Sequence, residues 1–335
     1  MRVLITGAAG MIGRRLTADL LDRPRLGERS ISAIDLADVI EPPADTAPKV
    51  GGHRPPSGGR RPEVTSHRID LNEATAVAAL VARRPDVVFH LAGVVSGEAE
   101  TDLAKGYRVN LDGTRTLFES LAAAPEVPRV VFTSSIAVFG APFPAVIPDD
   151  FHRTPLTSYG AQKAMGELLL ADLTRRGMID GIGIRLPTIT VRPGRPNAAA
   201  SGFFSSIIRE PLAGLRATLP VDRAVRHPHA SPASAVANLR HAAAIDGDAV
   251  GPHPTLTMPA LSVTVGEQLD ALARVAGPGV LDLIDVADDP LVAAIVAGWP
   301  RAFATDRARA LGFVVEDDYE RIIRRHLDDV EPPLG

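Results

Sequence analysis

The stretch Val3-Leu4-Ile5-Thr6-Gly7-Ala8-Ala9-Gly10-Met11-Ile12-Gly13 decides the fold. It begins as a short apolar, β-branched strand, and apolar residues at helical spacing follow it as far as Leu21. Three glycines at this spacing allow a tight turn, a close approach of the backbone to a pyrophosphate, and close packing of the helix. The stretch therefore predicts a dinucleotide site that includes Gly7, Gly10, Met11 and Ile12, rather than a plain strand–helix turn.

Acidic residues follow the next two predicted strands. Asp35 comes directly after residues 31–34 and is predicted to end that strand, where a carboxylate can bind ribose hydroxyls and repel a 2′-phosphate. This favours NAD over NADP. Asp70 and Leu71 follow the third strand and are expected near the adenine. A helix or turn cap is the alternative for Asp35, and an Asx turn is the alternative for Asp70.

Strand and helix patterns alternate through the first part of the chain. They predict strands at 64–69, 86–91, 129–133 and 181–186, and helices at 74–83, 98–124 and from about 156 onward. Continuous apolar strands alternating with helices indicate an α/β fold, a Rossmann-type doubly wound parallel sheet.

The chain divides after the last of these strands. Residues 1–186 are assigned to the dinucleotide-binding domain, and residues 187–335 mainly to a smaller C-terminal α/β substrate lobe, some segments of which can return to the sheet. Residues 41–62 contain six prolines and four glycines and are interpreted as a flexible surface insertion.

Composition excludes several classes of protein. The 335 residues carry a net charge of −4, which gives no general attraction to nucleic acid or anionic lipid. The absence of cysteine excludes disulfides and thiolate chemistry, so redox chemistry needs a borrowed cofactor. The N-terminus reaches glycine too early for a secretory signal, and no apolar stretch is long enough to span a membrane. We therefore expect a cytoplasmic protein.

Tyr159 and Lys163 are predicted to share one helix face, because side chains four residues apart point to the same side. A phenol with a pKa of about 10 is a poor base at neutral pH, and a nearby ammonium lowers that pKa. Alone, such a pair is usually a surface contact. Two features argue for a site: an apolar strand ends in Ser134-Ser135, and Phe89-His90-Leu91-Ala92-Gly93 offers small residues against which a flat ring can lie.

These motifs together resemble the extended short-chain dehydrogenase/reductase family along the whole chain. The features in that family's order and spacing are the Gly7/Gly10/Gly13 turn, His90-Leu91-Ala92-Gly93, Asn110 within 109–114, Ser135, Tyr159 and Lys163. The resemblance implies NAD as the cofactor, held also by Leu91, Ala92, Gly93, Asn110, Tyr159, Lys163 and Pro187. It further implies a homodimer formed through the predicted helices 98–124 and 156–175.

The same resemblance implies catalytic roles. Tyr159 would be the general base on a substrate hydroxyl, and Ser135 would hold that oxygen. Lys163 would bind the nicotinamide ribose and lower the phenol pKa. Ser134 is the weaker candidate for the serine role, and His90 is expected to be a packed residue rather than a catalyst.

The resemblance also narrows the reaction. Dehydratases of the family carry an acidic pair where this chain has Ser134-Ser135-Ile136, and nucleotide-sugar members usually carry Asn at the position of Thr188. The lobe offers few aromatic side chains for stacking on a nucleobase, so a small substrate is preferred. Stretches such as 139–144 and 192–197 resemble a subgroup that oxidises the C2 hydroxyl of a four-carbon sugar acid with NAD. The implied substrate is D-erythronate, converted to 2-dehydro-D-erythronate.

Such an acid needs a cation for its carboxylate, and a guanidinium matches that geometry best. Arg226 is the first candidate, because nucleotide-sugar relatives place a phosphate-binding arginine in its segment, and Arg192 is the second. The candidates for contacts with hydroxyls are Ser96, Ser135, Thr188 and Asn197.

His227 and His229 have a spacing that a metal could use, but no carboxylate cluster completes a site, so no metal is expected. Other functions stay open: a sugar epimerase or isomerase that retains NAD, a uronate- or threonine-type dehydrogenase, and a non-catalytic NAD-binding regulator. The presence of both Tyr159 and Lys163 disfavours the regulator.

Overall fold

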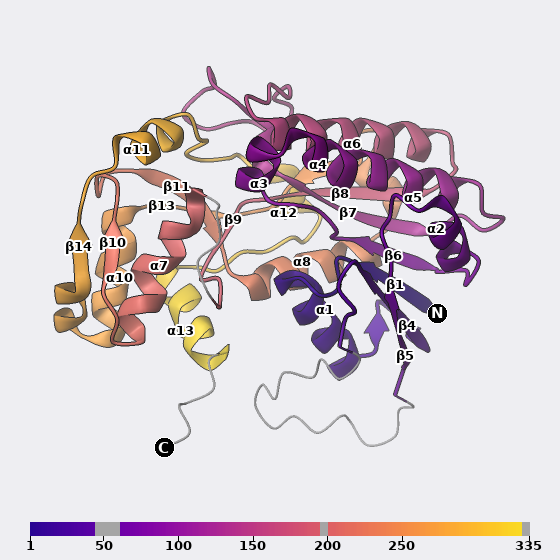
Figure 1. Ribbon diagram of the computed structural model, residues 1–335, viewed down its shortest axis with the longest axis horizontal. Helices are drawn as coiled ribbons and strands as arrows, with labels where there is room; N and C mark the ends of the chain where they lie inside the picture. Colours follow the sequence, from indigo (N-terminus) through magenta and orange to yellow (C-terminus); the bar gives the residue numbers. More distant parts are fainter. Residues whose placement is uncertain (44–60, 195–199, 330–335) are drawn as a thin grey trace.

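A parallel sheet forms the centre of the computed structural model, which describes residues 1–43, 61–194 and 200–329 (Figure 1). Its strands are β1 (Arg2–Thr6), β4 (Ala33–Asp38), β5 (Glu63–Arg68), β6 (Val87–His90), β7 (Arg129–Ser135), β8 (Asp180–Leu186) and β12 (Thr255–Thr257). They lie in the order β12-β8-β7-β6-β1-β4-β5, and every neighbouring pair is parallel. The predicted doubly wound α/β fold is confirmed. Residues 44–60 of the predicted insertion and Asn197 lie outside the described residues.

Helices cover both faces of this sheet (Figure 1). One face carries α1 (Met11–Asp22) and α8 (Pro232–Ala244), and the other carries α2 (Ala74–Val81), α5 (Gly113–Ala122) and α6 (Ser158–Arg175). Two apolar cores result, one around Leu16 and Leu239 and the other around Phe118 and Leu170, all fully buried. Burial of each such side chain stabilises the fold by roughly 1.5–3 kcal/mol. No helix that the structure describes is long and apolar enough to cross a membrane.

The predicted single helix over residues 98–124 is wrong. The chain forms α3 (Ser96–Thr101), α4 (Leu103–Tyr107), a π-helical turn over Arg108–Asp112, and then α5. Asp102 causes the first break: it leaves the helical conformation, and its carboxylate accepts a hydrogen bond from the Lys105 backbone N–H at 2.9 Å. Helical periodicity continues across both irregularities, so the pattern alone does not reveal them. Single π-turns of this kind often lie at functional sites.

The remaining elements build a second, smaller lobe. It contains a three-stranded sheet of β9 (Thr188–Ile189), β11 (Arg226–Ala230) and β13 (Leu261–Thr264), and a parallel pair, β10 (Ala217–Leu219) and β14 (Ile284–Val286). Its helices are α7 (Phe203–Leu212), α10 (Val265–Ala276), α11 (Pro290–Ala297) and α13 (Tyr319–Asp329). Short elements complete the chain: β2 (Arg25–Leu26), β3 (Arg29–Ser30), α9 (Gly247–Val250), α12 (Asp306–Ala310) and 3-10 turns at Ile136–Val138, Ala200–Gly202 and Pro278–Leu283. Because α8 and β12 pack on or join the main sheet, the division at residue 187 stays an interpretation.

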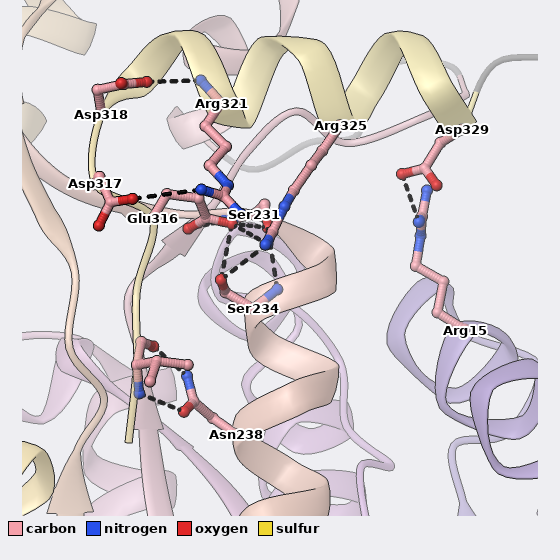
Figure 2. Close-up of polar contacts among 11 residues, drawn as sticks. Arg15, Ser231, Ser234, Asn238, Glu316, Asp317, Asp318, Arg321, Arg325 and Asp329 are labelled. Carbon is pink, nitrogen blue, oxygen red and sulfur yellow. Dashed lines mark hydrogen bonds and ion pairs between the residues drawn. The ribbon is translucent and has the colours of Figure 1, made fainter. Parts of the chain in front are cut away.

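A buried carboxylate ties the last helix to the main sheet's covering helices (Figure 2). Glu316 accepts hydrogen bonds from the Ser231 and Ser234 hydroxyls at the start of α8 and from Arg325 of α13, the last at 2.6 Å. At the end of α13, Asp329 pairs with Arg15 of α1 at 2.7 Å. The C-terminal helix therefore bridges α8 and α1, which belong to opposite ends of the sequence.

Substitution of this carboxylate is predicted to destabilise the protein. Glu316→Ala leaves the buried Ser231 and Ser234 hydroxyls without an acceptor and removes the carboxylate from Arg325, which keeps only its contacts with the two hydroxyl oxygens. The expected cost is about 2–3 kcal/mol of unfolding free energy, since a third of the Arg325 side chain stays exposed to water. The matched control is Asp317→Ala, whose exposed pair with Arg321 contributes nothing measurable. Urea unfolding checks both. Equal stability of the two variants would contradict this account of the C-terminal helix.

Candidate active site

The glycine turn lies between the ends of β1 and β6 and the start of α1. Gly7 has a φ of +71°, and a Cβ there would lie 2.6 Å from the Ala92 nitrogen. A Cβ on Gly13 would lie 2.3 Å from the Gly7 carbonyl oxygen. Both positions therefore require glycine. Gly10 caps α1 with no side-chain hydrogen bond, so the first N–H groups of the helix face outward, as an anion site needs.

The structure corrects the expected role of Asp35. This residue does not end its strand: it is buried within β4, and its carboxylate accepts hydrogen bonds from Arg2, Arg83 and the ring of His67 at 2.7–3.0 Å. Asp38 ends β4 instead, and it accepts a hydrogen bond from the Ala9 N–H of the glycine turn at 3.0 Å. The carboxylate beside the turn therefore belongs to Asp38.

His90 joins β1, β6 and α5 through a chain of buried hydrogen bonds. Thr114 donates to the Asn110 carbonyl and so accepts from His90 Nε2 at 2.8 Å, which leaves Nδ1 to accept from Thr6 at 2.7 Å. Burial, helped by the charge of Lys163, lowers the pKa of His90 to about 3. The ring is neutral and packed against Phe118 and Phe132, in agreement with the expected packing role.

Asn110 sits in the π-helical turn and holds the backbone next to Gly93. Its Oδ1 accepts a hydrogen bond from the Val94 N–H at 2.9 Å, and its Nδ2 donates to Gln162 at 2.8 Å. A Cβ on Gly93 would lie 2.9 Å from Asn110 Oδ1 and 3.4 Å from Lys163 Nζ. The break in the predicted helix thus brings Asn110 and Lys163 to one edge of the sheet.

Tyr159 and Lys163 point into the same space from α6, whose start is fixed by the Thr157 cap. Lys163 Nζ lies 5.8 Å from the centre of the Tyr159 ring and donates to the Thr133 carbonyl at 2.9 Å. Burial lowers the pKa of Lys163 to about 8, against the opposing charge of Glu167. Burial also raises the pKa of Tyr159, although Ser135 and Arg192 act to lower it. The sequence predicted a lowered phenol pKa; in the structure desolvation outweighs the charges.

The two serines that end β7 do different things. The Ser135 side chain is hydrogen-bonded to Tyr159 and acts to lower its pKa. The Ser135 oxygen accepts a hydrogen bond from the Ala137 N–H at 3.1 Å. Ser134 points the other way and donates to buried Glu167 at 2.6 Å. Arg185 donates to both oxygens of Glu167, and Arg153 donates to one of them. The preference for Ser135 over Ser134 therefore follows from the pleat of the strand.

Arg192, and not Arg226, lies beside the phenol. The Arg192 side chain is partly buried; its guanidinium donates to the Ile189 carbonyl at 3.0 Å and to Ser201 at 3.2 Å. Burial lowers the pKa of Arg192 while Tyr159 raises it, and it pairs with no carboxylate among the described residues. Arg226 donates to the Ser262 carbonyl and pairs with Glu267 at 3.2 Å, half exposed at the edge of the lobe. This geometry favours Arg192 over Arg226 as the candidate partner of a substrate carboxylate.

The other candidates fall into two groups. Thr188 is buried and hydrogen-bonded to His227, and Pro187 is buried beside it at the carboxyl end of β8. Ser96 opens α3, which lies against the start of α6, where Glu100 accepts from the Ser158 N–H. Their contacts with a ligand remain predictions, as do those of the residues near the expected adenine and nicotinamide rings, which are Asp70, Leu71, Leu91, Ala92 and Gly93.

Sequence reasoning missed several residues of this site. Asp38 follows two apolar residues after Asp35, and the continued apolar run Leu36-Ala37 was the signal that the strand extends past Asp35. Gln162 was given no role, but it is buried against Asn110. The buried Glu167 with its two arginines gave no local signal, because Arg153 and Arg185 come from distant parts of the chain.

The geometry fits a bound dinucleotide. The glycine cradle excludes side chains, the helix start offers free N–H groups, and Asp38 stands where a ribose would lie. Lys163 and Asn110 stand at the other end of the same edge, next to Tyr159. These residues would hold NAD along the carboxyl ends of the strands, where ligands bind in such sheets.

Comparison with known proteins gives a consistent result. The family described as the NAD dependent epimerase/dehydratase family matches residues 3–227 of the chain. D-erythronate dehydrogenase from Cupriavidus necator is 42% identical over 333 residues, which cover 98% of both chains. D-erythronate dehydrogenase from Haemophilus influenzae is 37% identical and covers 98% of this chain and 99% of its own.

One solved structure is also close. A crystal structure described as the nucleoside-diphosphate-sugar epimerase from Agrobacterium tumefaciens superposes with a TM-score of 0.91 at 52% identity. The match covers 98% of this chain and 94% of that chain.

The exchange of roles between Asp35 and Asp38 predicts a clear difference between two variants. Asp38→Asn removes the negative charge beside the glycine turn, so the ratio of the NADP to the NAD dissociation constant should fall about tenfold or more. Asp35→Asn should lower the unfolding temperature and leave that ratio within a factor of three, because its partners are Arg2 and Arg83. Calorimetric titration with both dinucleotides measures the effect. A larger change in Asp35→Asn would contradict the assignment.

Proposed function

The chain belongs to the NAD dependent epimerase/dehydratase family, and from this premise we propose that it is an NAD-dependent sugar acid dehydrogenase. Its proposed substrate is D-erythronate, whose C2 hydroxyl is oxidised to give 2-dehydro-D-erythronate and NADH. The two curated relatives that match along nearly the whole chain carry the name of that activity and support the proposal.

One observation carries the choice of an acidic substrate. Arg192 brings a partly buried positive charge next to Tyr159, and no carboxylate among the described residues neutralises it. An isolated buried charge is costly, so a protein that keeps one usually pairs it with a ligand. A substrate carboxylate on Arg192 places the adjacent C2 hydroxyl near Tyr159, because C1 and C2 are directly bonded.

The side chains then divide the chemistry. Tyr159, as phenolate, takes the proton of the C2 hydroxyl, and Ser135 donates a hydrogen bond to the same oxygen as the carbonyl forms. Lys163 carries positive charge beside the phenolate and would contact the cofactor ribose. NAD, when bound, supplies the acceptor for the C2 hydride and a positively charged ring that favours the phenolate. The C2–H electron pair leaves as hydride, the O–H proton leaves to Tyr159, and the product is a 2-keto acid.

A second candidate is an epimerase that keeps its NADH. The observation that favours it is the Agrobacterium tumefaciens structure, which is 52% identical and carries an epimerase description. Both reactions use the same tyrosine and differ in whether reduced cofactor leaves. Release of NADH therefore separates them.

A homodimer remains part of the proposal. Apolar side chains are exposed on α4 and α6, the two neighbouring helices of the predicted dimer face. They are Leu103, Tyr107 and Leu168, with Leu156 just before α6. Burial of this face against a second copy would remove that apolar surface from water.

When purified protein is given NAD and each member of a panel of C4 to C6 aldonates and uronates, D-erythronate is predicted to support the reduction of NAD. Tyr159→Phe removes only the ionisable oxygen and should lower kcat by about 10²–10⁴-fold, because the proton acceptor is lost. NADH absorbance measures both. Turnover by Tyr159→Phe within a few-fold of wild type would refute the proposed base, and acids converted without NADH release would favour the epimerase.

Arg192→Met is predicted to lower kcat/KM for the sugar acid on the order of 10²–10³-fold, mainly through KM, because the substrate carboxylate loses its partly buried partner. Arg226→Met, the matched control, should stay within about threefold. Arg192 also lowers the pKa of Tyr159, so its loss should move the rising limb of the pH profile of kcat/KM to higher pH. A stronger effect of Arg226→Met would return the carboxylate role to Arg226.

A further inference from the structure

A series of buried hydrogen bonds runs from Pro300 in the second lobe to Thr188 at the edge of the candidate site. Thr188 Oγ1 lies 2.7 Å from His227 Nε2, and His227 Nδ1 lies 3.2 Å from the Pro300 carbonyl oxygen. The three residues come from β9, β11 and the segment that follows α11. All three are buried.

The Pro300 carbonyl fixes which group donates in each of these hydrogen bonds. A carbonyl oxygen only accepts, so the proton of the neutral ring must sit on Nδ1. Nε2 then carries a lone pair and accepts the hydroxyl proton of Thr188. Thr188 has no second proton to donate, so towards any other group its oxygen can only accept.

The ring of His227 has no freedom to reverse this order. It stacks on Phe204 with ring centres 5.1 Å apart and planes 4° apart, and Trp299 lies 5.2 Å away on the lobe side. Both ring nitrogens are engaged. Burial lowers the pKa of His227 to about 3, although the bond to Pro300 acts to raise it, so the ring stays neutral in the ordinary pH range.

Thr188 belongs to the same edge as the catalytic groups. Leu186, the last residue of β8, pairs with Ser135, and Thr188 follows two residues later. The carbonyl of the next residue, Ile189, holds Nε of Arg192. The segment therefore runs from the serine of the site to its cation, with Thr188 in the middle.

We propose that His227 is a positioning residue that makes Thr188 an obligate acceptor for a substrate hydroxyl beyond C2. The assignment rests on the proposed function, since it presumes a small hydroxy acid held by Arg192. A hydroxyl at C3 or C4 can donate a proton to the Thr188 oxygen, whereas a methylene or methyl group leaves the acceptor capacity of that buried oxygen unused. The site then selects polyhydroxy acids over simple 2-hydroxy acids.

The test compares D-erythronate with its 3-deoxy and 4-deoxy analogues, all of which keep the C2 hydroxyl and the carboxylate. Wild type should prefer D-erythronate over at least one analogue by about tenfold or more in kcat/KM. Thr188→Val should reduce that preference to under about threefold, because KM for D-erythronate rises. Its kcat/KM for the analogue should stay as in wild type. Thr188→Ser should keep it.

His227 is tested by removal and by rescue. His227→Leu removes the acceptor of the Thr188 proton and should lower the preference at least about threefold, whereas His227→Gln offers a carbonyl oxygen to that proton and should keep it within about twofold. As a readout independent of turnover, ¹⁵N NMR of the nine histidines should show one resonance pair, lost in His227→Gln, with Nδ1 protonated and Nε2 not.

Two results would overturn the assignment while leaving the proposed function intact. One is an equal loss on D-erythronate and both analogues in Thr188→Val and His227→Leu, which a structural role gives. The other is a protonated Nε2 in the NMR spectrum. A wild type that reduces NAD with none of these acids would instead contradict the proposed function, and the assignment with it.

Discussion

The contact between Gly7 and the backbone of Ala92 is the constraint on which the rest of the site depends. It brings the ends of β1 and β6 together so closely that a single methyl group at position 7 would overlap the neighbouring chain. With this spacing set, the start of α1 and the end of β4 meet at the same edge. The cofactor groove is therefore a result of backbone packing, and its polar groups are added around it.

The second lobe supplies the positive charge that lies beside Tyr159. Two carboxylates buried in the sheet and its covering helix are already neutralised: Asp35 by two arginines, and Glu167 by two more. Arg192 enters from the lobe with no such partner among the described residues and lies beside Tyr159. This contrast separates charges that hold the fold from a charge that is left for a ligand, and it is why we connect the site with an acid rather than with a neutral sugar.

Sequence patterns could predict the sheet, the glycine turn and the Tyr159–Lys163 pair, because each depends on residues close together in the chain. They could not predict the break at Asp102 or the π-helical turn, since helical periodicity passes through both. They placed the ribose carboxylate at Asp35, because local sequence does not show where a strand stops pairing. The resemblance to nucleotide-sugar relatives ranked Arg226 above Arg192, and it could not show that Arg226 pairs with Glu267, which lies 41 positions away in the chain.

The central claim is that the site transfers a hydride from C2 of an acid bound beside Tyr159 to NAD, and that the reduced cofactor is then released. D-erythronate deuterated at C2 tests it most directly. The account predicts deuterium at C4 of the nicotinamide in free reduced cofactor, in equal amount to the 2-keto acid, as mass spectrometry would show. Deuterium that stays in the sugar acid pool, with inverted configuration and no free reduced cofactor, would contradict it.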